Sequence, residues 1–463
     1  MTLDVGKEPS CPRSVVVVGA GFSGTMAAIH LRALLPPGWI VHLIERSGRF
    51  ARGPAYADSG VPHLLNVRAR NMSAFADDPG HFERWLDGSG QRFAGEVIDT
   101  AAGRFATRRL YGRYLRSLLH ERILRSGGCV RLVADEAVDL VPADGKWRLV
   151  CRSGRTIEAA AVVVTVGNLP APEPSDAQVM RDPWTAGAMP GLVADRPLLI
   201  VGTGLTMVDL VLELRAAGFA GPIVALSRRG LLPQSHEPIP MPWPTPSFDE
   251  QERRSISALL ARVRAEVRQA AARGIGWRAV VDSLRPVTAS LWKSLPAIER
   301  GRFLRHLRPY WDSHRHRMAP PAAEAFAQVR AAGSLTICRG RILGLSRGAG
   351  GVNVSIQAPA GASPTTLLVQ RVIYATGVPP TAEHHPLIGN LFCRGLARPD
   401  RQAMGLDVTD ALEVISGSGQ TTPGLWAFGP IVRGVFWECT AVPDIRVHAQ
   451  DVAGRVAAAL TTG

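Results

Sequence analysis

A glycine pattern near the start of the chain has the residue types and spacing of a dinucleotide site. Gly19, Gly21 and Gly24 form Gly-x-Gly-x-x-Gly, and Glu45 follows the last of them by twenty-one residues. In such a motif the first glycine permits a tight turn, the second lets a diphosphate approach the backbone, and the third lets a helix pack on a strand. A carboxylate at this distance can accept hydrogen bonds from ribose hydroxyls. The position near the N-terminus of a long chain favours FAD over NAD.

A second glycine pattern begins at Gly202 and continues with Gly204, but Met207 stands where a third glycine would be. At the equivalent of Glu45 this site carries Arg228 and Arg229. Two guanidinium groups suit the 2′-phosphate of NADPH through bidentate hydrogen bonds. The alternative is a pair of solvated arginines in a turn. We expect Met207 to hold the helix slightly further from its strand than a glycine would.

The elements around both patterns come in the order strand, glycine turn, helix, strand. In the first copy the β-branched run 14–18 precedes the turn, and the run 39–45 ends at the acid. In the second copy the runs 198–201 and 222–227 flank an apolar helical stretch. This order predicts an α/β fold with two Rossmann-like dinucleotide-binding domains.

Five strings carry a resemblance to a known family: GAGFSGT, HLLNVRARNMSAF, VGTGLTMVD, HLRPYWDSHRHRM and RGVFWECTAVPDIR. With them the chain resembles bacterial FAD/NAD(P)-binding flavoproteins of glutathione reductase-type architecture, related to the N-hydroxylating class B flavin monooxygenases. The resemblance implies an FAD-binding domain in two parts, 13–195 and 370–463. Between them it implies an NADPH-binding domain, 196–369, with a helical insertion at about 248–332.

The resemblance also assigns residues to the two cofactors. Contacts with FAD are expected from Gly19, Gly21, Phe22, Ser23, Gly24, Glu45, Arg46, Arg52, Gly429, Trp437 and Thr440, and contacts with NADPH from Gly202, Gly204, Leu205, Thr206, Arg228 and Arg229. The loop from Arg52 to Phe75 would pass the flavin. Within it, Asn66 and Met72 are candidate catalytic neighbours of the flavin, and loop packing is an equally good interpretation of each.

The C-terminal stretch GLWAFGPIVRGVFWECTAVPDIRVHAQ predicts a strand, a glycine turn and a helix that begins between Thr440 and Pro443. The positive end of this helix could stabilise a reduced, anionic flavin. Relatives often carry Gly-Asp in the turn, whereas this chain has Gly429-Pro430. We therefore assign the flavin contact there to backbone groups.

The segment HLRPYWDSHRHRM, 306–318, contains three histidines and three arginines. On a helix His314 and His316 point too far apart to share a metal ion, and Pro309 is expected to break the helix after His306, so we predict no metal site. One interpretation is a solvated helix with pairs of Asp312 to Arg308 and to His316, each at i, i+4. The other is a lid in which Arg308, Arg315 or Arg317 binds an anion, while Trp292, Tyr310 and Trp311 form an apolar wall. Arg308 is also a candidate catalytic residue.

Composition excludes several classes of protein. The formal net charge is +14, but the basic residues are scattered, which argues against nucleic-acid binding. The sequence shows neither a long apolar run for a membrane helix nor a signal peptide, so a cytoplasmic location is the expectation. The six cysteines lie far apart, which argues against structural zinc and a redox dithiol.

Two dinucleotide sites imply hydride transfer from NADPH to flavin. The family resemblance implies oxygen activation through a C4a-(hydro)peroxyflavin and, most simply, N-hydroxylation of an amine or amino acid. The partners would be O2 and a small molecule, possibly one with a carboxylate. Two alternatives stay open: an NADPH-dependent dehydrogenase or reductase without oxygen insertion, and a non-catalytic flavin-bound redox sensor. The sequence indicates neither the substrate nor the oligomeric state.

Overall fold

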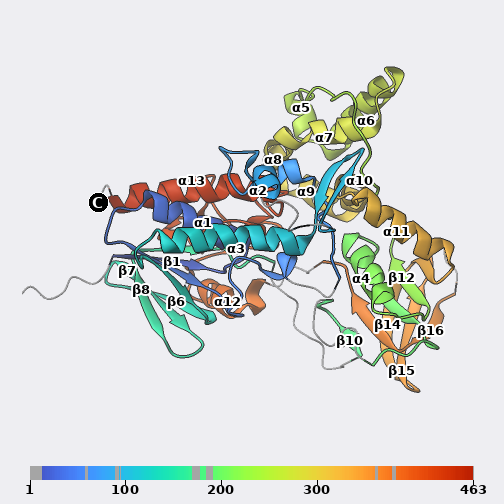
Figure 1. Cartoon of the computed structure of the whole chain (residues 1–463), viewed down its shortest axis with the longest axis horizontal. Coiled ribbons are helices and arrows are strands. Elements are labelled where there is room, and N and C mark those ends of the chain that lie inside the picture. Colours follow the sequence, from blue (N-terminus) through green and yellow to red (C-terminus); the bar gives the residue numbers. More distant parts are fainter. Residues whose placement is uncertain are drawn as a thin grey trace, which may run out of the picture.

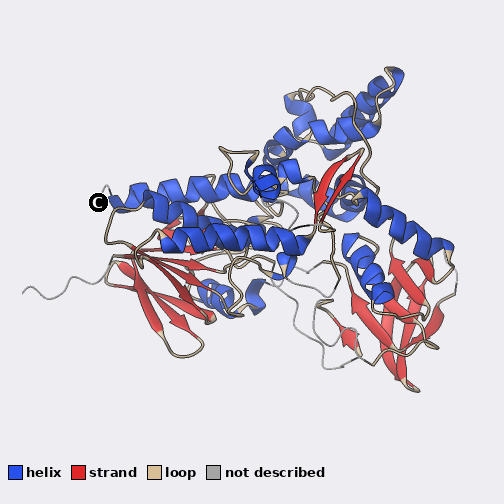
Figure 2. Ribbon diagram, in the orientation of Figure 1, coloured by secondary structure: helices blue, strands red, loops and turns tan. Residues whose placement is uncertain are grey.

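The computed structural model describes residues 13–57, 61–88, 93, 95–168, 178–183, 191–359, 363–377 and 382–461. Figure 1 shows two sheet-containing units side by side, with an arm formed by α5, α6 and α7 projecting above them. Figure 2 shows that this arm is built of helices, whereas the strands lie in the two units.

The first unit contains a six-stranded sheet. Its order is β18 (Glu413–Ile415), β19 (Thr421–Ala427), β9 (Ala161–Val164), β1 (Ser14–Val18), β2 (Ile40–Ile44) and β5 (Val130–Val133). All neighbours are parallel except β18 and β19. Every residue of β1 is buried, as expected for a parallel strand covered on both faces.

Helices and small sheets complete this unit. The helices are α1 (Phe22–Leu34), α2 (His81–Gly88), α3 (Arg108–Leu124), α12 (Pro386–Cys393) and α13 (Val442–Thr461), with short 3-10 turns η1 (Pro54–Tyr56), η2 (Ala69–Asn71), η5 (Ala382–His384) and η6 (Pro430–Val432). The antiparallel strands are β3 (Val97–Thr100), β4 (Gly103–Ala106), β6 (Ala137–Ala143), β7 (Lys146–Cys151) and β8 (Thr156–Ala159). Helix α13 packs along α1, so the two ends of the chain share one core.

The second unit contains a five-stranded parallel sheet. Its order is β10 (Val179–Met180), β17 (Arg371–Tyr374), β11 (Leu198–Val201), β12 (Ile223–Ser227) and β13 (Leu335–Arg339). Helices α4 (Leu205–Ala216) and α11 (Pro320–Ala331) pack together beside it. An antiparallel sheet of β14 (Arg341–Gly348), β15 (Gly351–Gln357) and β16 (Thr365–Val369) closes the unit.

The chain passes from the first unit to the second and back again. Strand β9 belongs to the first sheet, and the next described strand, β10, belongs to the second. Strand β17 is the last of the second sheet, and β18 and β19 return to the first. Two parallel sheets connected in this way are the predicted α/β fold with two Rossmann-like units, which the structure confirms.

The insertion consists of α5 (Glu250–Arg253), α6 (Ile256–Ala272), α7 (Trp277–Ser283), α8 (Arg285–Ser294), α9 (Ala297–Arg302), the π-helical turn η4 (Phe303–Leu307) and α10 (Arg308–Arg315). It has an apolar core of its own, which includes Phe248, Trp292 and Phe303. The proline-rich segment 235–246 leads into it without regular helix or strand. Trp243 anchors that segment, because its indole N–H donates to Glu266 at 2.8 Å.

The expected break at Pro309 is wrong. The chain stays helical from Ala297 to Arg315, and the π-helical turn η4 lies immediately before the proline. Pro309 occupies the first turn of α10, where a missing backbone N–H costs little, and the wider π turn changes the hydrogen bonding ahead of the ring.

Among the described residues, no helix is both long enough and apolar enough to cross a membrane.

Candidate functional site: two nucleotide turns and the helical wall between them

The first glycine turn has the geometry that its spacing predicts. Gly19 has a φ of +95°, and a methyl group built on it would lie 2.6 Å from the carbonyl oxygen of Thr165, which directly follows the neighbouring strand β9. A methyl group on Gly24 would lie 1.7 Å from the carbonyl oxygen of Gly19. Both positions therefore require glycine, the first for its turn and the second for the close approach of α1.

The N-terminus of α1 is open to a ligand. Gly21 precedes the helix without a side-chain cap, and the nearest atom to a methyl group built on it is the Cα of Gly53, at 3.9 Å. The nearest part of the facing loop is thus another glycine, next to Arg52, and among the described residues no side chain from elsewhere in the chain lies within 4 Å of this methyl position. Phe22 and Ser23, the first two helical residues, are buried. Free backbone N–H groups and the positive end of the helix fit a diphosphate.

Glu45 lies beside this turn, directly after β2. One carboxylate oxygen accepts the backbone N–H of Ala20 at 3.0 Å, and the other accepts the hydroxyl of Ser47 at 2.8 Å. These bonds hold the acid next to the glycine turn, and it remains partly exposed. Arg46 is exposed beyond it. The arrangement fits the expected ribose contact, which stays a prediction.

The C-terminal turn, which we define as the segment from Gly429 to Thr440, approaches the N-terminus of α1. Gly429 has a φ of +83°, and a methyl group built on it would lie 2.6 Å from the hydroxyl of Ser23. The thiol of Cys439 donates to the Gly429 carbonyl at 3.1 Å and closes the loop that follows. Helix α13 begins at Val442, within the predicted range, with Thr440 exposed just ahead of it. Backbone groups of Gly429 can therefore meet a ligand held by α1.

The second glycine turn repeats the first with one difference. Gly202 has a φ of +116°, and a methyl group on it would lie 2.5 Å from the carbonyl oxygen of Ala375. Gly204 precedes α4, is exposed, and has open space on its Cα. Leu205 and Thr206 are half-buried at the start of that helix. Both glycines needed for a diphosphate approach are thus available.

Met207 occupies the position in α4 that Gly24 occupies in α1. Its side chain is fully buried in the apolar core of the second unit. A methionine in place of a glycine at this position therefore fills the space between helix and sheet with a side chain. It leaves the exposed face of Gly204 unaffected. The expected wider spacing of helix and strand stays a prediction.

The arginine pair follows β12. Arg228 is exposed and Arg229 is half-buried. The guanidinium of Arg229 lies over the ring of Tyr310 from α10, 5.1 Å from its centroid. The hydroxyl of Ser227 accepts the N–H of Gly230 at 2.9 Å and fixes the turn that carries the pair. The charged groups thus lie at the end of the strand where a 2′-phosphate would bind, and one of them already contacts the insertion.

The insertion packs against the C-terminal turn. The indole of Trp437 lies 4.9 Å from that of Trp292 and 5.3 Å from the ring of Phe303, as centroid distances. The indole N–H of Trp437 is buried and has no hydrogen-bond partner among the described residues. A buried donor normally has a partner, so a ligand acceptor at this point fits the residues present.

Two acids that the sequence did not single out organise the segment 306–318. Glu438, whose side chain is 6% exposed, accepts the Trp311 indole N–H at 2.9 Å and a guanidinium N–H of Arg315 at 3.2 Å. Asp282 pairs with Arg317, whose side chain is 1% exposed. Arg315 and Arg317 therefore have partners within the protein.

The remaining members of this segment form the expected helical pairs. Arg308 donates to Asp312 at 3.3 Å, and His316 lies 3.7 Å from the same carboxylate. The guanidinium of Arg308 also lies 5.9 Å from the centroid of Trp437. The interpretation as a paired helix thus holds for these residues, and a catalytic role for Arg308 stays a prediction. Among the described residues, no three His, Cys, Asp or Glu side chains come close enough to hold a metal ion.

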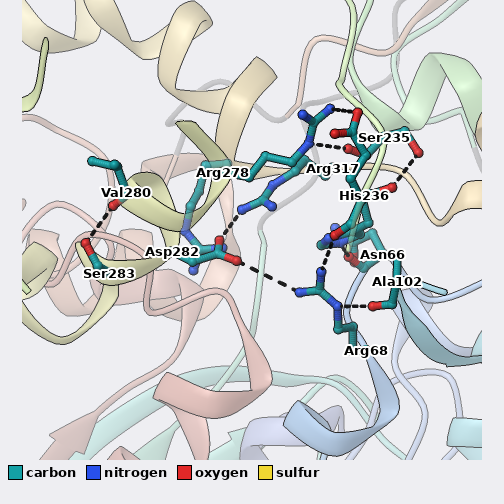
Figure 3. Close-up of polar contacts among 12 residues, drawn as sticks. Asn66, Arg68, Ala102, Ser235, His236, Arg278, Val280, Asp282, Ser283 and Arg317 are labelled. Atoms are coloured by element: carbon teal, nitrogen blue, oxygen red, sulfur yellow. Dashed lines mark hydrogen bonds and ion pairs between the residues drawn. The ribbon is translucent and has the colours of Figure 1, made fainter. Parts of the chain in front are cut away.

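Figure 3 shows Asp282 between two arginines that come from different parts of the chain. Arg68 of the first unit lies 3.9 Å from Asp282 and donates to the carbonyl of Ala102 at 2.5 Å. His236 of the linker lies beside them, and its Nε2–H donates to the carbonyl of Asn66 at 2.9 Å. Burial lowers the pKa of His236 to about 4. This cluster fixes the insertion and its linker to the first unit.

The two candidate flavin neighbours, Met72 and Asn66, have different surroundings in the structure. Met72 is 2% exposed and belongs to the core of the first unit, so packing accounts for its side chain, and its role beside the flavin stays a prediction. The structure thus favours core packing for Met72, since an apolar side chain after the turn η2 is stabilised by burial. Asn66 stays partly exposed, and its backbone carbonyl is engaged by His236.

A second junction connects the units through α4. Arg108, at the start of α3, donates to Asp209 at 2.6 Å. His63 lies 3.1 Å from Glu213 on the same helix. The acids occupy one face of α4, because they are four residues apart. Sequence reasoning treated α4 only as the helix of the second nucleotide site, and no local signal showed that its polar face binds another domain.

Comparisons with known proteins agree with this geometry. Residues 16–169 match the family model described as FAD-NAD(P)-binding. Ornithine hydroxylase (PvdA) from Pseudomonas aeruginosa has a similar structure, with a TM-score of 0.62, 15% identity, and 97% of this chain and 99% of that chain covered. L-lysine 6-monooxygenase from Pseudomonas syringae gives a TM-score of 0.63 and 16% identity over 96% of this chain and 99% of that chain. No curated protein sequence gives a significant match.

The match to the family model thus covers the first glycine turn and Glu45. The chain as a whole has the two-unit fold of the ornithine and lysine hydroxylases. Bacillithiol disulfide reductase Bdr (YpdA) from Bacillus cereus also shares it, with a TM-score of 0.52 and 13% identity over 96% of this chain and 99% of that chain. At such identities the likeness establishes the fold, and the chemistry depends on the residues of this chain.

Proposed function

We propose that this chain is an NADPH-dependent FAD monooxygenase that hydroxylates the amine nitrogen of a small molecule. The observation that carries the proposal is the pair of glycine turns. Each has a positive φ at its first glycine and an uncrowded second glycine ahead of a helix, at Gly21 and Gly204. One chain thus offers two diphosphate sites, as transfer of electrons between two dinucleotides requires.

The residues present fit FAD at the first turn. The amides at the start of α1 would bind the diphosphate, and Glu45 the ribose. The backbone at Gly429 and the buried N–H of Trp437 would meet the ring system. When bound, FAD supplies the hydride acceptor and the site of reaction with O2. The protein contributes binding, orientation and the exclusion of water.

The helical insertion favours oxygenation of a substrate over simple reduction of an acceptor. Trp292 is 3% exposed, and together with Phe303 and Trp437 it makes an apolar wall beside the C-terminal turn. Such a wall keeps water from a reactive site. The similar Kutzneria sp. 744 ornithine N-hydroxylase, solved with reduced FAD, NADP⁺ and L-ornithine, has a TM-score of 0.57 and 15% identity over 97% of this chain and 99% of that chain.

A disulfide reductase, another chemistry with this fold among the comparisons, uses a pair of reacting thiols, and the cysteines that the structure describes form no such pair. The described cysteines, Cys129, Cys151, Cys338, Cys393 and Cys439, are all free thiols, and the sequence spaces none of them as a dithiol. Cys439 is the one beside the C-terminal turn. Burial raises its pKa, so its thiol stays protonated and unreactive.

The test is turnover of the FAD-loaded protein with NADPH, O2 and a panel of amines that starts with L-ornithine and L-lysine. We expect an amine to stimulate NADPH oxidation, with hydroxylamine formed in proportion and little H2O2 released. Turnover with an artificial electron acceptor but without oxygen in any product would identify a reductase. Flavin that NADPH cannot reduce would contradict both enzymatic functions.

A further inference from the structure

Helix α10 contacts a candidate residue of the NADPH site, Arg229, and also the turn that we expect beside the flavin. Tyr310 is 47% exposed, and its ring lies under the guanidinium of Arg229, 5.1 Å from the centroid. The next residue, Trp311, donates its indole N–H to Glu438 at 2.9 Å. Consecutive helical residues point about 100° apart, so one helix presents different sides to the two sites.

The backbone and side chain of Glu438 are both held in one conformation. Its φ is +69°, which a residue with a side chain rarely adopts, and its carboxylate is buried between Trp311 and Arg315. Such a backbone persists where the surrounding contacts determine it. The preceding residue, Trp437, is packed between Trp292 and Phe303. The insertion therefore sets the conformation of the turn that we expect beside the flavin.

The contact at Tyr310 is of a different kind. An exposed cation–π pair is weak, whereas an arginine and a phosphate form a charge-assisted, often bidentate, pair. A bound 2′-phosphate would therefore take Arg229 away from Tyr310. Because Glu438 holds α10 in place, the ring of Tyr310 competes with the phosphate for the same guanidinium.

We propose that α10 couples the two nucleotide sites, with Glu438 as its positioning residue. Glu438 fixes α10 so that Tyr310 occupies Arg229, and a coenzyme with a 2′-phosphate must displace that ring. Loss of the contact between Arg229 and Tyr310 shifts α10, and Glu438, which binds Trp311 and Arg315 of α10, transmits that shift to the turn that carries Trp437. The environment of the flavin therefore depends on coenzyme occupancy. This inference rests on the proposed function, because it uses the NADPH site at Arg228 and Arg229.

The test uses FAD-loaded protein and two probes, 2′,5′-ADP and 5′-AMP, which differ in the 2′-phosphate. Their dissociation constants are measured by titration calorimetry, and the visible absorption spectrum of the flavin is recorded with each. In the wild type we expect 2′,5′-ADP, and not 5′-AMP, to perturb the flavin spectrum. In Glu438→Gln, which frees α10, we expect 2′,5′-ADP to bind about fivefold more tightly, the lower end of ordinary coupling between sites. The spectral response should be lost.

Two further variants make the result specific. Tyr310→Leu removes the competing ring directly and should also tighten 2′,5′-ADP without changing 5′-AMP, even if Glu438→Gln folds poorly. Asp410→Asn removes another ion pair between the insertion and the first unit, that of Lys293 and Asp410 at 2.5 Å. It does not involve α10 and should behave as the wild type.

The outcomes separate this inference from the proposed function. Weaker binding of both probes in Tyr310→Leu would mean that the ring stacks on adenine, and would overturn the coupling. Binding of 2′,5′-ADP without any change in the flavin spectrum of the wild type would also overturn it and leave the NADPH site intact. Failure of 2′,5′-ADP to bind at all would remove the NADPH site, and the proposed function with it.

Discussion

The buried imidazole of His236 should make the stability of this protein depend on pH. Burial lowers its pKa to about 4, against 6.5 for an exposed histidine. Between these values the unfolded chain binds a proton that the folded chain does not, so stability falls as the pH falls through this window. Each pKa unit corresponds to about 1.4 kcal/mol, so lowering the pH from 7.5 to 5 should cost about 2 kcal/mol at this residue alone.

The variant His236→Gln isolates this contribution. Glutamine keeps an N–H donor for the Asn66 carbonyl but does not titrate. The free energy of unfolding in urea is measured for the wild type and the variant at pH 7.5 and at pH 5. The difference between the two proteins changes with pH only through the titration of His236, so any loss of stability that the variant shows at neutral pH cancels. We expect the variant to lose about 2 kcal/mol less than the wild type on acidification. An equal loss in both proteins would refute the buried, neutral imidazole.

Three other substitutions test the site and its support. Gly24→Ala places a methyl group 1.7 Å from the Gly19 carbonyl and should abolish most FAD binding, as flavin absorbance of the purified protein would show; full FAD content would contradict the first turn. Replacing Arg228 with Ser should raise the KM for NADPH about tenfold or more and leave that for NADH unchanged, since a hydrogen bond to a charged group contributes about 1.5–3 kcal/mol. Equal effects on both coenzymes would contradict this role. Asp282→Asn should destabilise the fold by about 3 kcal/mol in urea unfolding, because it leaves Arg317 buried without a counter-charge, and a loss below about 1 kcal/mol would contradict the pairing.

The parts of the fold that depend on local signals could be predicted from the sequence. The glycines of both turns, the acid after β2 and the start of α13 lie where their spacing placed them. Each of these follows from a steric or hydrogen-bonding requirement between residues close along the chain or on adjacent parallel strands. A methyl group at Gly19 or Gly202 would collide with the neighbouring strand, which is why these glycines are reliable indicators.

The contacts that assemble the site could not be predicted in the same way. Glu438 meets Trp311 and Arg315 across more than a hundred residues of chain, and nothing in the string FWECT distinguishes it from a surface acid. Pro309 alone predicts the end of a helix, but the chain continues from a π turn directly into α10 with the proline in its first turn, which no local pattern indicates. The surroundings of Met72 could not be predicted either, because a methionine in a loop can contact a ligand or pack in a core.

The proposed function depends on one step, the delivery of electrons by NADPH to a flavin held by the same chain. It is tested most directly by mixing the FAD-loaded protein anaerobically with NADPH, and separately with NADH, while the visible flavin absorption is followed. We expect NADPH to bleach the flavin and NADH to do so much more slowly, because Arg228 and Arg229 recognise the 2′-phosphate. A flavin that remains oxidised with NADPH, or is reduced equally fast by NADH, would contradict it.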